Sequence, residues 1–181
     1  MVDQARKLFQ FSTRDILLMV TIAIVFGLLT APLQLASSAL SVSAPFAQRL
    51  LSGAYMIAPL FGAVVFRRIG VAFLIPLLSS LVWVGTTPFG FAVILLGLFL
   101  GVYCETGVAI ACCYRNFNTI PLIVAGMIAG ALSFVISSVL FQLTNITIWI
   151  GLGYLVLQMI SGGIAGYLAV QLAHIIQRAG L

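Results

Sequence analysis

Long apolar segments dominate this chain and constrain its fold more than any other feature. A helix needs about 20 mainly apolar residues to cross a bilayer, and few other structures satisfy their backbone hydrogen bonds there. Only 6% of the residues are charged, against about 25% in soluble domains. We therefore predict an all-α integral membrane protein, a single domain over residues 1–181. Its six transmembrane helices are expected at residues 14–33, 50–66, 70–87, 91–114, 119–143 and 148–176.

The basic residues predict how these helices are oriented. Cytoplasmic loops of membrane proteins carry an excess of lysine and arginine. With the N-terminus inside, only Arg49 of the eight basic residues falls outside. Both termini are therefore predicted to be cytoplasmic. Because the positive charges lie at segment ends and not on one soluble aromatic-rich face, nucleic acid is excluded as a partner. The seven cytoplasmic residues are Arg6, Lys7, Arg14, Arg67, Arg68, Arg115 and Arg178.

A single glutamate, Glu105, interrupts the fourth segment. With a helical rise of about 1.5 Å per residue, it lies roughly 21 Å from Phe91 and about 13 Å from Tyr114, near mid-membrane. A charge at that depth costs about 2.5–3.5 kcal/mol, and no lysine or arginine of the other segments is expected at the same depth. We interpret Glu105 as a functional group. The alternative is a protonated glutamate bonded to a backbone carbonyl or a hydroxyl.

Two glycines accompany this carboxylate. Gly97, Gly101 and Glu105 are spaced i, i+4 and i+8, so they share a helix face. Two glycines beside one carboxylate predict a hollow with an anionic floor. We expect this hollow to bind a flat, positively polarised small molecule, with Glu105 as its anchor.

Residues of other segments are candidates to complete this site. Tyr154 and Gln158 share a face of the sixth segment and could supply an aromatic wall and amide contacts. Trp83 and Trp149 could close the site, or they could belong to the aromatic belt at the membrane interfaces. Tyr103 points away from Glu105 on its helix and is not placed in the site.

Small residues form stripes on two helices. Ala23, Gly27 and Ala31 line one face of the first segment, where they would let another helix approach closely. The neighbouring helix could belong to this chain or to a partner. A comparable stripe at Gly126 and Gly130 is predicted to pack internally. Residues 34–48 are expected to form an external loop, either a lid over the site or a passive connector.

Four stretches in order along the chain resemble the S component of an energy-coupling factor (ECF) vitamin transporter. The likeness is to the YkoE type, associated with thiamine and its hydroxymethylpyrimidine precursor. Two departures concern the ligand: the third segment has no acidic residue, and Gln158 stands where a basic residue is more familiar. The stretches are Arg14-Asp15-Ile16 to Val25-Phe26-Gly27, Gly90 to Glu105, Ile120-Pro121-Leu122 to Ala125-Gly126-Met127, and Ile160-Ser161-Gly162-Gly163 to Gly166.

This resemblance implies a membrane subunit that captures thiamine or hydroxymethylpyrimidine for ATP-driven uptake. It implies a transmembrane coupling subunit, which the Ala23, Gly27 and Ala31 stripe would contact, and two ATPase subunits. The chain has no GxxxxGK[ST] motif, so ATP hydrolysis is expected in those partners. A proton-coupled small-cation transporter without an ATPase partner is the alternative.

Other classes find little support in the residues. The single histidine, His174, has no serine or aspartate arrangement around it that predicts catalysis, so we expect no enzyme. Cys104, Cys112 and Cys113 lack the spacing of a zinc motif. No metal site and no cofactor are predicted.

Overall fold

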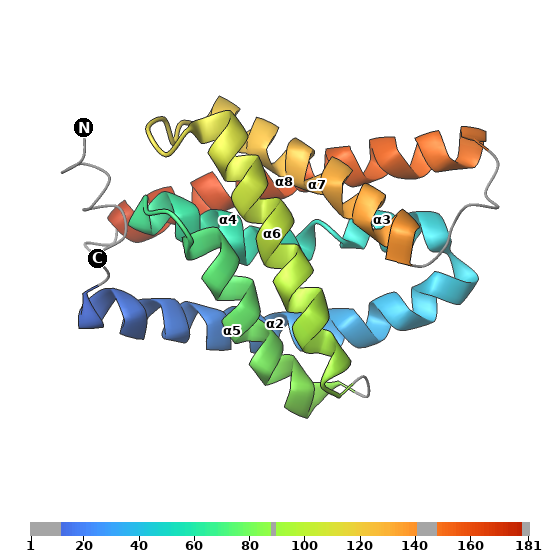
Figure 1. Cartoon of the computed structure of the whole chain (residues 1–181), viewed down its shortest axis with the longest axis horizontal. Helices are drawn as coiled ribbons and strands as arrows, with labels where there is room; N and C mark the ends of the chain where they lie inside the picture. Colours follow the sequence, from blue (N-terminus) through green and yellow to red (C-terminus); the bar gives the residue numbers. More distant parts are fainter. Residues whose placement is uncertain (1–11, 88–89, 141–147, 179–181) are drawn as a thin grey trace.

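The computed structural model describes residues 12–87, 90–140 and 148–178, and every element in these ranges is a helix. The prediction of an all-α membrane protein is confirmed. In Figure 1 the helices form one bundle, and the short α3 connects α2 to α4. The helices are α2 (Thr13–Ser43), α3 (Pro45–Leu51), α4 (Ala54–Phe66), α5 (Val71–Thr86), α6 (Ala92–Cys112), α7 (Thr119–Leu140) and α8 (Ile148–Arg178).

The six predicted spans correspond to these helices. A shorter apolar helix, Val71–Thr86, takes the place of the predicted third span. The predicted end of the fifth span, beyond Leu140, lies outside the described residues. Within the described residues, five stretches are long and apolar enough to cross a membrane, namely Thr13–Ser37, Phe46–Phe66, Ala92–Cys112, Thr119–Val139 and Trp149–Ile176.

The prediction of an external loop at residues 34–48 is wrong. Helix α2 continues to Ser43, and α3 begins at Pro45. The segment from residue 34 to 43 holds leucine, alanine and serine but no glycine or proline, so nothing in it stops a helix. The break falls at Ala44, which has φ −149°. Pro45 restricts this preceding residue to extended conformations and then starts α3, where a missing N–H costs nothing.

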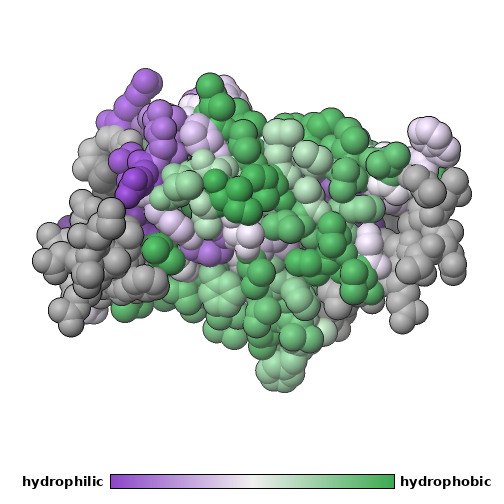
Figure 2. Space-filling view, turned by 45° about the horizontal axis from the view of Figure 1, so that its top comes forward, coloured by the Kyte–Doolittle hydropathy of each residue, from purple (hydrophilic) through white to green (hydrophobic). Residues whose placement is uncertain are grey.

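One end of the bundle collects the charged side chains of the described residues except Arg49, and we call it the basic end. It contains the first turn of α2, the α4–α5 turn, the α6–α7 turn and the last turn of α8 (Figure 1). The Arg68 guanidinium pairs with the Asp15 carboxylate at 2.8 Å, and Asp15 also accepts the Ser12 backbone N–H at 2.9 Å. Hydrophilic residues gather at this end in Figure 2, while a hydrophobic surface covers the middle. This distribution is that of a bundle embedded in lipid.

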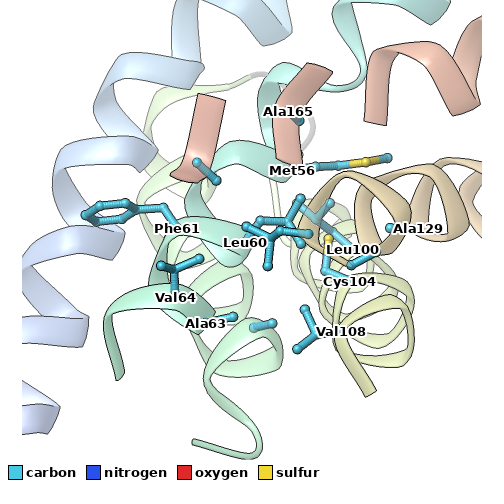
Figure 3. Packing of buried hydrophobic residues seen from close by; sticks show 14 of the residues in the cluster. Met56, Leu60, Phe61, Ala63, Val64, Leu100, Cys104, Val108, Ala129 and Ala165 are labelled. Carbon is cyan, nitrogen blue, oxygen red and sulfur yellow. The ribbon is translucent and has the colours of Figure 1, made fainter. Parts of the chain in front are cut away.

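Helix α4 occupies the centre of the bundle and packs on the five longer helices of the described residues, α2, α5, α6, α7 and α8. In Figure 3 Phe61 points toward α2, and Leu60 lies toward Leu100 and Cys104 of α6. The rings of Phe61 and Phe26 of α2 are 5.9 Å apart. Because a lipid tail is as apolar as leucine, packing of this kind holds a membrane bundle together more than the hydrophobic effect does.

The orientation of the bundle stays a prediction, and reporter fusions test it. Truncated fusions after Arg68, Gly90 and Asn118 should report inside, outside and inside, because the positive-inside bias places the basic end in the cytoplasm. Alkaline phosphatase activity should appear only for the Gly90 fusion. Two successive fusions on the same side would contradict the predicted topology.

Candidate functional site

Glu105 belongs to α6. Its side chain lies at the start of α5, where it caps that helix. Its Oε1 accepts the Gly70 backbone N–H at 2.7 Å, and its Oε2 accepts the Phe73 N–H at 3.1 Å. These are two of the N–H groups that the first turn of a helix leaves without partners, and the carboxylate also complements the positive end of the helix dipole. These hydrogen-bond partners of Glu105 therefore lie within the chain, and both are neutral backbone groups and not a cation. The predicted role as a ligand anchor has no support in these contacts.

Tyr114 completes the surroundings of this carboxylate. Its hydroxyl donates a hydrogen bond to Glu105 Oε1. Cys113 and Tyr114 both have left-handed backbones, with φ 46° and 54°. Because these residues form a tight turn after α6, the Tyr114 side chain turns back toward Glu105. Burial raises the pKa of Tyr114, and its hydrogen bond to the carboxylate raises it further. The arrangement fastens α5, α6 and the α6–α7 turn together at the basic end.

The predicted hollow beside Gly97 and Gly101 is filled by α5, so this prediction is wrong. A Cβ at Gly97 would lie 2.5 Å from Ser80 Cβ, and one at Gly101 would lie 2.8 Å from the Phe73 carbonyl oxygen. The shared face of the two glycines and Glu105 is confirmed. What faces it is a helix of the same chain, because glycine lets two helices approach closely.

The stripe on α2 also packs internally, which corrects its predicted role as a partner surface. Ala23 is fully buried, and its carbonyl accepts a hydrogen bond from the Ser79 hydroxyl of α5 at 3.0 Å. A Cβ at Gly27 would lie 3.1 Å from Val82 Cβ. Ala31 belongs to the main hydrophobic core. All three residues therefore face this chain's own helices.

Trp83 lines a small cavity between α2, α4, α5 and α6. The space within it is about that of one water molecule. Its polar groups are already paired: the Trp83 indole N–H lies 3.1 Å from both the Gly27 carbonyl and the Thr30 hydroxyl. Tyr55 packs edge-on against Trp83, with ring centroids 6.0 Å apart. The cavity offers a ligand little space and no free hydrogen-bonding group on the tryptophan.

A different polar cluster lies at the opposite end of the bundle, where α3, α7 and α8 meet. Gln158 of α8 is 2% exposed, and its Nε2 donates to the Ser133 hydroxyl at 2.8 Å. Arg49 of α3 donates from Nη1 to the Ser137 hydroxyl at 3.4 Å. Tyr154, one turn before Gln158, has the Arg49 guanidinium 5.1 Å from its ring centroid. We call these five residues the outer cluster.

Two buried atoms of the outer cluster have no hydrogen-bond partner in the described part of the chain. They are the Arg49 Nε, a donor, and the Gln158 Oε1, an acceptor. A buried polar atom without a partner costs about 1–3 kcal/mol, and an ionisable residue inside a membrane segment usually marks a functional site. In the sequence, Glu105 fits the second of these arguments. In the structure, Arg49 fits both.

Helix α3 covers the outer cluster. Its Phe46 ring lies 4.9 Å from that of Tyr154. The turn between α3 and α4 is fixed to α8 by Ser161, whose hydroxyl accepts the Gly53 N–H at 2.9 Å and donates to the Leu50 carbonyl. Access to the cluster from the side of α3 therefore requires α3 to move around this fixed point.

The structure thus separates the predicted site residues. Tyr154 and Gln158 lie together in the outer cluster, as their spacing predicts. Trp149 is 81% exposed and closes no site, in keeping with the alternative of an interfacial belt. The sequence missed Arg49, although it is the one basic residue that departs from the positive-inside pattern. It also excluded Tyr103, whose side chain lies close to Ser133, the hydrogen-bond partner of Gln158.

Comparisons with known proteins agree with a membrane transport subunit. The solved structure titled "Crystal structure of an S-component of ECF transporter" superimposes with a TM-score of 0.87 at 24% identity, over 95% of this chain and 88% of that chain. The fold is therefore that of an S component. No curated protein matches the chain.

The family model described as "ABC-type cobalt transport system, permease component" matches residues 14–132, and the chain belongs to this family. The family description mentions cobalt. Within the described residues, no group of three or more His, Cys, Asp and Glu side chains is placed to hold a metal ion.

Proposed function

We propose that this chain is the substrate-binding membrane subunit of an ECF-type importer and that it captures thiamine or its hydroxymethylpyrimidine precursor. The family of permease components and the S-component fold support the subunit's class. The ligand rests on the sequence resemblance and on the chemistry of the outer cluster. A coupling subunit and two ATPase subunits would complete the importer and hydrolyse ATP.

The unpaired Gln158 Oε1 is the observation that carries the choice of site. This buried oxygen can accept a hydrogen bond from the exocyclic amine of an aminopyrimidine. The Arg49 Nε–H can donate to a ring nitrogen or a hydroxyl of the same molecule. Ligand sites in proteins combine apolar and aromatic walls with a few polar groups of this kind, and the paired rings of Phe46 and Tyr154 are the aromatic groups beside these atoms. A ligand would satisfy both atoms that the chain leaves unpaired.

Helix α3 would act as the lid of this site. The sequence located a possible lid at residues 34–48, and the structure has Phe46 and Arg49 of α3 on Tyr154. Outward movement of α3 would admit the ligand, and its return would enclose it. Excluding water in this way strengthens each polar contact inside.

Calorimetry with the purified chain tests this function. We expect saturable binding of hydroxymethylpyrimidine or thiamine and no binding of Co²⁺. Gln158→Leu should weaken the tighter ligand about 5- to 10-fold, the cost of one lost hydrogen bond. Gln171→Leu on the same helix is the matched control, because Gln171 is exposed, and its affinity should equal that of the wild type. Binding of Co²⁺ alone, or equal affinities for both variants, would contradict the proposal.

A further inference from the structure

Arg49 carries a positive charge into the bundle without a neighbouring carboxylate. It is half-buried and lies within the Phe46–Phe66 membrane segment. The acidic side chains of the described residues are Asp15 and Glu105. Asp15 pairs with Arg68 at the basic end, and Glu105 caps α5 there. Neither is available to neutralise Arg49.

Among the described residues, the groups that surround Arg49 are neutral. Arg49 contacts the Ser137 hydroxyl and the Tyr154 ring, and the next turn of α7 and α8 contributes Ser133 and Gln158. The face of Tyr154, which would attract a cation, is already occupied by the guanidinium. The outer cluster therefore has a net positive charge. The face of Tyr154 that lies toward Arg49 is not free to bind a ligand cation.

We propose that Arg49 determines which ligand charge the outer cluster accepts, so that a neutral aminopyrimidine binds more tightly than a permanent cation. This inference rests on the proposed function. Thiamine carries a thiazolium cation, whereas hydroxymethylpyrimidine is neutral at pH 7. Two like charges about 6 Å apart in a partly buried site repel strongly enough to lower affinity about 10- to 100-fold. The wild type should therefore prefer hydroxymethylpyrimidine by about that factor.

Three variants test the role of this charge. Arg49→Gln removes the charge and frees the face of Tyr154, so thiamine affinity should rise and the preference should fall to within about threefold. Arg49→Lys keeps a positive charge, and the preference should remain above tenfold. Ser137→Asp keeps Arg49 but adds a carboxylate where its Nη1 already points. It should lower the preference as Arg49→Gln does, which keeps the test decisive if Arg49→Gln does not fold.

The measurement is a titration of each variant with both compounds, alongside a thermal melt without ligand to confirm folding. A preference that follows charge across the wild type and the variants supports the inference. Binding of both compounds with an unchanged ratio in Arg49→Gln or Ser137→Asp would overturn it and leave the proposed function standing. Failure of the wild type to bind either compound would overturn the proposed ligand class, and this inference with it.

Discussion

Gly162→Ala is expected to destabilise the protein by about 2–3 kcal/mol and to lower its melting temperature by roughly 4–12 °C. Helices α7 and α8 cross with their backbones in contact at Gly126 and Gly162. A Cβ on either glycine would meet the carbonyl oxygen of the other at a distance that real Cβ atoms do not show. Because backbone atoms cannot rotate away as a side chain can, the two helices would have to separate.

Gly151→Ala on the same helix is the matched control. The nearest atom to a Cβ at Gly151 is Phe134 Cζ at 3.9 Å, an ordinary contact. Alanine has a higher helix propensity than glycine, by about 0.8–1.0 kcal/mol, so this variant should be as stable as the wild type or slightly more so. Thermal melts of both purified variants make the comparison. Equal melting temperatures would show that the α7–α8 contact is looser than the structure has it.

The same residue pattern led to one correct and one wrong prediction. The stripe at Gly126 and Gly130 was predicted to pack internally, and the contacts of both glycines with α8 confirm this. The stripe at Ala23 and Gly27 was assigned to a partner through the resemblance, and it packs on α5. A stripe of small residues predicts a close helix contact. It does not specify the helix, because that choice depends on the order in which the helices pack.

Hydropathy predicted the helices because a membrane leaves the backbone few other structures. It did not predict the helical segment 34–43, since mixed serine and alanine is compatible with a helix or a loop. The site required tertiary information. The unpaired Gln158 Oε1 and Arg49 Nε are visible only when α3 is placed on α7 and α8. Likewise, the partners of Glu105 are backbone N–H groups of α5, which carry no side-chain signature in the sequence.

Glu105→Gln is expected to destabilise the empty protein by about 1.5–3 kcal/mol, the range for hydrogen bonds to a charged group. Glutamine keeps one acceptor oxygen but turns an NH₂ group toward the Gly70 or Phe73 N–H, so one capping bond becomes a contact between two donors. The favourable interaction with the α5 helix dipole is lost as well. Ligand affinity should change less than twofold, because the outer cluster lies at the opposite end of the bundle.

This expectation differs from the one that the sequence supports. An unpaired mid-membrane carboxylate that anchors a ligand would give the reverse result, with lower affinity and an empty protein as stable as the wild type or more so. Tyr114→Phe is the matched comparison, because it removes one donor to the carboxylate and leaves the α5 cap in place. It should destabilise less than Glu105→Gln. Thermal melts without ligand, calorimetry, and hydrogen exchange at the first turn of α5 distinguish the two roles. Faster exchange at Phe73 with unchanged affinity identifies the cap, whereas unchanged exchange with weakened binding would restore Glu105 as the ligand anchor.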